Sequence, residues 1–164
     1  MEGDVSVKPW AVAALTLVLA RGLSASFFDV LPTAAFPADT PRVATVLGHG
    51  WGEDVSDPEQ VAAYARFLAG AAPARVRLIE LGRSQEGRPL LMLAVSAAEH
   101  ISRLEAIRAD LDRLADPRRV RDAEVDTVVS KVPVVVWIGG SVHGDEPSGG
   151  EAALALAHLL AFAD

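Results

Sequence analysis

The spacing of hydrophobic residues predicts two amphipathic helices in the middle of the chain. The first is expected to begin with a capping box of Ser56 and Glu59 and to end at Gly70. Its apolar stripe consists of Val61, Tyr64, Ala65 and Leu68. The second should end before Pro117, because proline cannot continue a helix. Its apolar positions are Ile101, Leu104, Ile107, Leu111 and Leu114.

Between these helices, partly alternating apolar residues indicate two strands. The segments ARVRLIELG and RPLLMLAVS flank the turn GRSQEG, in which Gly82 and Gly87 suit the backbone angles of a tight connection. We therefore expect an antiparallel pair.

A third strand is predicted near the end of the chain. Residues Val134–Ile138 form a continuous apolar run rich in β-branched side chains, as in a strand that is covered on both faces of an α/β sheet. A helix is expected to follow from Ser148, with Glu151 completing its capping box. The turn between strand and helix would lie at the carboxyl end of a central strand, where α/β proteins bind ligands.

Composition narrows the class of protein. The chain has 164 residues, of which 51% are hydrophobic, so it is long enough for one domain with a core. Its formal net charge of −7 disfavours a nucleic-acid partner. Because it lacks cysteine, any metal must be held by histidine and carboxylate side chains.

The N-terminal residues 1–26 have the layout of a secretory signal peptide. Lys8 precedes the apolar run Trp10–Ala20, and small residues follow at positions 24–26. The run is shorter than the roughly 20 residues that a membrane-spanning helix needs, so we expect no stable membrane span. The protein is thus expected outside the cytoplasm, secreted or periplasmic, with residues 27–55 as an irregular lead-in to the main domain.

The predicted turn contains His143 and Glu146, three residues apart, whose side chains can converge on one point. Zinc accepts an imidazole nitrogen and a carboxylate oxygen and can activate a water in an open position. The alternative is structural, since carboxylates before a helix also stabilise its N-terminus. His49 is interpreted as a structural loop residue, and His158 as part of an apolar helix.

Two motifs in order give the chain a resemblance to a known family. They are GRSQEGR, with Gly82, Ser84, Gly87 and Arg88, and HGDEPSG, with His143, Gly144, Glu146 and Gly149. On these the chain resembles the zinc metallocarboxypeptidases of the carboxypeptidase A type, from about Trp51 onward. The resemblance implies an α/β mixed-sheet fold, Zn²⁺ as cofactor, a peptide or protein substrate, and hydrolysis of C-terminal peptide bonds by zinc-activated water.

By this resemblance, His143 and Glu146 are two zinc ligands and Arg88 lines the substrate cleft. The family also requires a distal histidine ligand and a glutamate general base, which have no counterpart in this sequence. We therefore expect residues 56–164 to be the N-terminal part of a peptidase domain, inactive as a fragment. The alternatives are a zinc-dependent deacylase of the aspartoacylase type and a non-catalytic binding module on the same scaffold.

Overall fold

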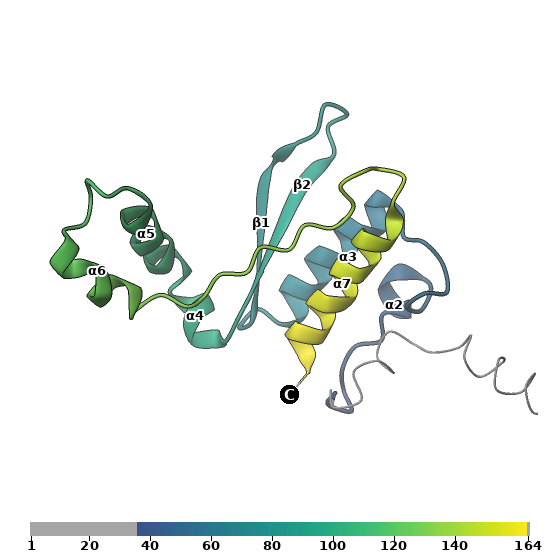
Figure 1. The fold of residues 1–164 in the computed structure, drawn as a ribbon. Coiled ribbons are helices and arrows are strands. Elements are labelled where there is room, and N and C mark those ends of the chain that lie inside the picture. The colour runs from purple at the N-terminus through teal and green to yellow at the C-terminus, as the bar shows by residue number, and fades with distance from the viewer. Residues whose placement is uncertain (1–35, 164) are drawn as a thin grey trace, which may run out of the picture. The chain divides into compact units, whose positions relative to one another are not determined.

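The computed structural model describes residues 36–163. The chain divides into two units, Met1–Ala34 and Ala35–Asp164, and the predicted signal peptide lies outside the described residues. The elements of the second unit are, in order, α2 (Ala44–Leu47), α3 (Pro58–Ala71), β1 (Val76–Arg83), β2 (Pro89–Val95), α4 (Ala98–Ser102), α5 (Leu104–Ala115), α6 (Asp122–Val129) and α7 (Pro147–Phe162) (Figure 1). No helix among the described residues is long and apolar enough to cross a membrane.

The N-cap of helix α3 lies one residue later than predicted. Asp57 is the N-cap: its side chain accepts the Gln60 N–H at 2.7 Å, and the Gln60 side chain accepts the Asp57 N–H at 2.8 Å. The predicted capping box of Ser56 with Glu59 is therefore wrong. A cap at Asp57 places Pro58 at the first helical position, where its missing N–H costs nothing.

The predicted antiparallel pair is confirmed. Strands β1 and β2 pair from Val76 opposite Val95 to Arg83 opposite Pro89. The register shifts between Glu80 and Gly82, which indicates a bulge. In the turn, Gly87 has a φ of 78°, a conformation in which any side chain would be strained.

The hydrophobic core lies between the two-stranded sheet and two helices. Helix α3 packs against both strands, and α7 packs against α3 and β2 (Figure 1). This arrangement confirms the α/β class, because each helix buries its apolar stripe against the sheet or the other helix. The buried core residues are Leu47, Tyr64, Leu68, Val76, Leu154 and Ala161.

The second predicted helix is divided into α4 and α5. The break falls at Arg103, which has φ −117° and ψ 23°, while Ile101 and Ile107 on either side of it are buried. Helix α5 ends at Ala115 as expected, because Pro117 disfavours helical angles at the residue before it. Two further helices, the single turn α2 and the helix α6, lie where the sequence pattern predicted none.

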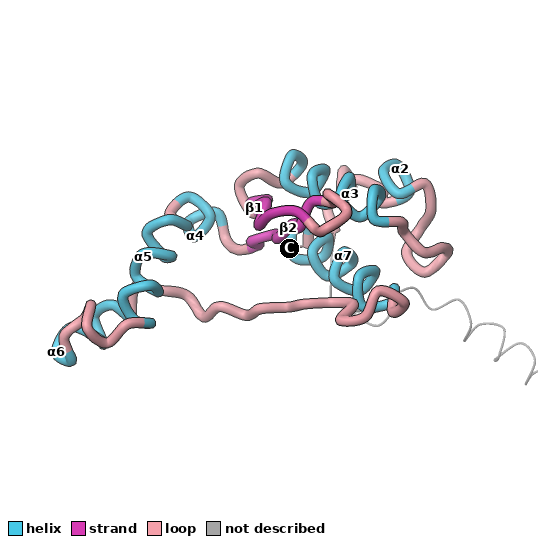
Figure 2. The backbone as a smooth tube through the Cα atoms, turned by 90° about the horizontal axis from the view of Figure 1, so that it is seen from above, coloured by secondary structure: helices cyan, strands magenta, loops and turns pink. Residues whose placement is uncertain are grey.

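The predicted strand Val134–Ile138 is not a strand in the structure. Figure 2 shows this segment as a loop, and the sheet of the described residues contains β1 and β2. Its side chains are exposed: Val134 by 93%, Val135 by 63%, Val136 by 75%, Trp137 by 72% and Ile138 by 57%. A strand needs a neighbour to accept its backbone hydrogen bonds, and no described segment pairs with this one.

Candidate functional site

The loop after Val134–Ile138 carries the predicted ligand pair just before α7. Glu146 is the N-cap residue of α7, and His143 lies three residues earlier. Nδ1 of His143 lies 3.0 Å from Oε1 of Glu146, so the two side chains face each other. Their convergence comes from the turn, in which the Glu146 N–H donates to the His143 carbonyl at 3.2 Å.

The two side chains are close together and accessible. Two ligands at about 2.0–2.2 Å from a tetrahedral zinc are about 3.3–3.6 Å apart. The observed nitrogen–oxygen distance of 3.0 Å is that of a hydrogen bond, so a small separation of the two atoms would admit the metal. The His143 and Glu146 side chains are 69% and 56% exposed, so a metal ion or substrate can reach them. Asp145, between them in sequence, takes no part in a recorded ion pair or hydrogen bond within residues 36–163.

Two ligands do not complete a metal site. Within residues 36–163, no group of three or more His, Cys, Asp and Glu side chains is arranged to hold a metal ion. The donor types and spacing of His143 and Glu146 fit part of a zinc site.

Ser141 is part of this site and was not singled out by the sequence analysis. Its hydroxyl donates to the Glu146 carbonyl at 2.6 Å and accepts the Gly150 N–H at 2.9 Å. The sequence signal is weak, since the residue stands in a run of small residues before His143. Only the tertiary structure shows that its hydroxyl spans the turn.

The predicted capping box of Ser148 and Glu151 is not formed. The N-cap of α7 makes no side-chain hydrogen bond. Oε1 of Glu151 instead accepts the Ser56 N–H at 2.7 Å, and its Oε2 is buried without a hydrogen-bond partner among the described residues. This contact ties the first turns of α7 to the segment that precedes α3. His49 lies beside it, with Nε2 3.4 Å from the Ser56 hydroxyl.

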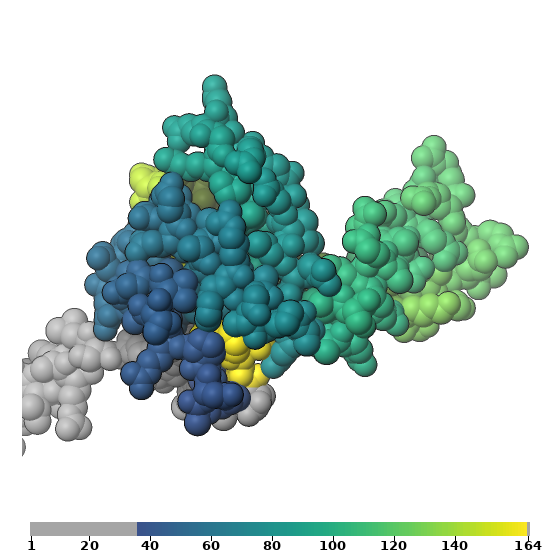
Figure 3. Space-filling view, turned by 180° about the vertical axis from the view of Figure 1, so that it is seen from behind, coloured from purple at the N-terminus to yellow at the C-terminus, as the bar shows by residue number. Residues whose placement is uncertain are grey.

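Arg88 lies at the end of the β1–β2 turn, which projects from the neighbouring atoms in the space-filling view (Figure 3). Its guanidinium forms an ion pair with Glu86 at 3.2 Å, and its backbone N–H donates to the Ser84 hydroxyl at 3.1 Å. No hydrogen bond or ion pair among the described residues joins Arg88 to His143 or Glu146. The structure therefore brings the two predicted ligands together, but not the predicted substrate residue.

His158 is buried on α7, as its place on an apolar helix predicted. It is 5% exposed, and its Nδ1 is hydrogen-bonded to the Tyr64 hydroxyl at 2.7 Å. Burial lowers the pKa of His158 below 6.5, which favours the neutral imidazole. The rings of Trp51 and Phe162 lie 5.9 Å and 4.9 Å from its ring. These contacts give His158 a structural role.

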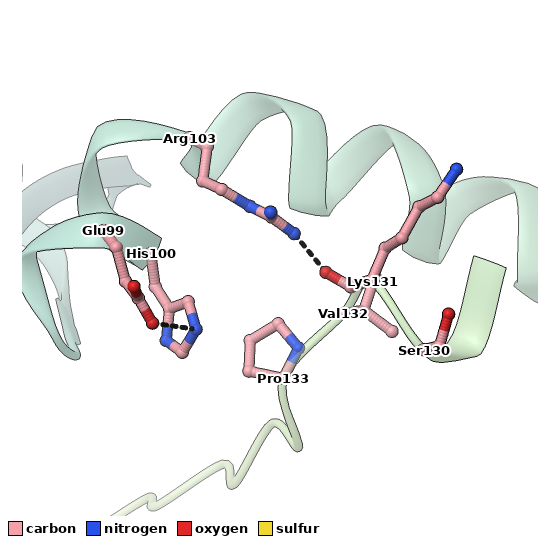
Figure 4. A pocket seen from close by; sticks show the side chains of 7 residues that line it. All are labelled: Glu99, His100, Arg103, Ser130, Lys131, Val132 and Pro133. Atoms are coloured by element: carbon pink, nitrogen blue, oxygen red, sulfur yellow. Dashed lines mark hydrogen bonds and ion pairs between the residues drawn. The ribbon is translucent and has the colours of Figure 1, made fainter. Parts of the chain in front are cut away.

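A cavity of about 420 Å³ lies between α4 and the end of α6 (Figure 4). There the Arg103 guanidinium donates to the Lys131 carbonyl, and the His100 ring lies 3.5 Å from the Glu99 carboxylate. None of the predicted site residues lines this cavity. Its lining is Glu99, His100, Arg103, Ser130, Lys131, Val132 and Pro133.

Comparison with known proteins gives a family match. A family model described as zinc carboxypeptidase matches residues 61–163, which include the hairpin turn, His143, Glu146 and all of α7. No curated protein and no solved structure matches the chain. The family match gives no support to the deacylase alternative. The helices and small antiparallel sheet are consistent with part of a carboxypeptidase-like α/β fold. This chain belongs to the zinc carboxypeptidase family.

Proposed function

We propose that His143 and Glu146 are two protein ligands of a catalytic zinc in a carboxypeptidase. The observation that carries this proposal is the 3.0 Å approach of Nδ1 of His143 to Oε1 of Glu146, within the segment that matches the family model. Both side chains are exposed, whereas a purely structural ion pair at this turn would add little stability.

The chemistry of the two side chains suits this role. When bound, zinc would polarise the scissile carbonyl of a peptide and lower the pKa of a water. His143 would bind through Nδ1 as a neutral imidazole, and the Glu146 carboxylate would offset part of the metal's charge. The Ser141 hydroxyl donates to the Glu146 backbone carbonyl, which fixes the backbone position from which the Glu146 side chain extends. The third ligand and the general base have no counterpart among the residues of this sequence.

Arg88 is proposed as a substrate-binding residue. A guanidinium can bind a carboxylate through two parallel hydrogen bonds, and a carboxypeptidase substrate ends in a carboxylate. In the structure this guanidinium already pairs with an exposed carboxylate, that of Glu86. A substrate's C-terminal carboxylate could replace the Glu86 carboxylate on the Arg88 guanidinium and form the same kind of ion pair.

Zinc titration of the chain tests the ligand assignment. His143→Ala and Glu146→Ala should each weaken zinc binding by at least about tenfold, because each removes a direct donor. Asp145→Ala is the matched control, since it removes an exposed carboxylate from the same turn and should leave the zinc affinity within about twofold. The affinity is measured by competition with a chromophoric chelator, and circular dichroism verifies folding. Unchanged zinc binding in His143→Ala would reject the assignment.

We also propose that the protein is exported, on the strength of the signal-like residues 1–26. Mass spectrometry of the exported protein should then find an N-terminus near Ser26 or Phe27. An intact Met1 on exported protein would contradict the proposal.

A further inference from the structure

Ser141 has an uncommon backbone conformation at the start of the ligand turn. Its φ is 54°, and it is the one residue other than glycine with a positive φ among residues 36–163. L-amino acids with a side chain rarely adopt this region.

The Ser141 hydroxyl connects the ligand turn to the first turn of α7. It donates at 2.6 Å to the backbone carbonyl of Glu146, a residue whose side chain is a proposed ligand. It accepts the N–H of Gly150 at 2.9 Å, which in a regular helix would donate to the Glu146 carbonyl four residues earlier. The hydroxyl thus bridges the Gly150 N–H and the Glu146 carbonyl at the start of α7.

Two glycines allow this close contact between the turn and the helix. A Cβ atom added to Gly149 would lie 2.5 Å from the Ser141 nitrogen, and one added to Gly140 would overlap the Gly149 carbonyl oxygen. The backbone on both sides of the turn is therefore held in direct contact. If the Ser141 hydroxyl is removed, the backbone hydrogen bond that remains inside the turn is the one from the Glu146 N–H to the His143 carbonyl, at 3.2 Å.

We propose that Ser141 is a positioning residue for the metal ligands His143 and Glu146. The inference rests on the proposed function of these two residues as zinc ligands. Because both ligands are exposed, packing does not hold their side chains, and the turn must fix their separation. Groups that orient metal ligands from outside the coordination sphere commonly change metal affinity by about 10–100-fold when they are removed.

Ser141→Gly is the test variant, because it removes the –CH₂OH side chain and glycine adopts a positive φ without strain. Ser148→Gly is the matched control: it makes the same chemical change in the first turn of α7, where the hydroxyl has no recorded hydrogen bond. The zinc affinity of the full chain and its stability without zinc are measured for both variants and for His143→Ala. We expect Ser141→Gly to weaken zinc binding by at least about tenfold and Ser148→Gly by less than about twofold.

Three outcomes overturn the positioning role. Ser141→Gly binding zinc as tightly as the wild type, or weakened no more than Ser148→Gly, would show that the hydroxyl does not place the ligands. Ser141→Gly losing stability while it keeps its zinc affinity would give Ser141 a structural role alone. Unchanged binding in His143→Ala would remove the ligand assignment itself, and with it the positioning role.

Discussion

The buried contact between Tyr64 and His158 joins α3 to α7, and replacing the tyrosine by phenylalanine tests how much it stabilises the domain. Tyr64 is fully buried and His158 is 5% exposed. Tyr64→Phe keeps the ring and its packing against Trp51 and Phe67 and removes only the hydroxyl. The measured change therefore reports on the hydrogen bond rather than on a new cavity.

The expected loss follows from the burial of both partners. Removing one partner of a buried hydrogen bond costs about 1–3 kcal/mol when the other is left without it. His158 has further contacts that remain, so we expect the free energy of unfolding to fall by about 1–2 kcal/mol. Urea unfolding at pH 7.5 measures it. A fall below about 0.3 kcal/mol would refute the contribution of this hydrogen bond.

The same contact predicts how stability depends on pH. Burial lowers the pKa of His158 in the folded state below its usual 6.5, so the unfolded chain binds more protons in mildly acidic solution. The stability associated with neutral His158 is complete well above pH 6.5 and is lost as the pH falls below that value. His158→Gln removes this titration, and its free energy of unfolding should vary less than that of the wild type between pH 7.5 and 5. Parallel curves for the two proteins would contradict the lowered pKa.

Two further substitutions test the fold. Val136→Lys should change the free energy of unfolding by less than about 0.5 kcal/mol, because the side chain is 75% exposed; a loss of several kcal/mol in urea unfolding would show instead that the segment is a buried strand. Asp57→Ala should cost about 1 kcal/mol, because it removes the acceptor for the Gln60 N–H at the start of α3. Thermal unfolding measures that loss, with Asp54→Ala in the preceding turn as the control. Equal melting temperatures of Asp57→Ala and the wild type would argue against the cap.

The helices and the hairpin could be predicted because their signals are local. Helix α3 is specified by its apolar stripe and by proline near its start, and the hairpin by two apolar runs around a turn with Gly87. The cap of α3 was predicted at Ser56 and not at Asp57, because neighbouring polar residues compete for the N-cap position. The break at Arg103 gives no clear signal in a pattern that repeats evenly across it.

The predictions for the ligand turn differ in how far they depend on the tertiary structure. The interval between His143 and Glu146 was enough to suggest a common ligand point, because three residues in a turn bring two side chains to one side. The role of Glu151 was misjudged, because its partner Ser56 lies 95 residues away in sequence. The role of Ser141 was missed, because a hydroxyl that spans a turn leaves no spacing rule.

The sequence by itself determined the family, the helical and hairpin segments, and the donor types available to a metal. Each of these depends on residue identity and on short-range spacing. The tertiary structure decided which groups meet: the Tyr64 hydroxyl with His158, the Ser56 backbone N–H with the Glu151 carboxylate, and the Ser141 hydroxyl with the backbone of Glu146 and Gly150. It also decided that Val134–Ile138 is exposed, since a strand forms only where another segment can pair with it.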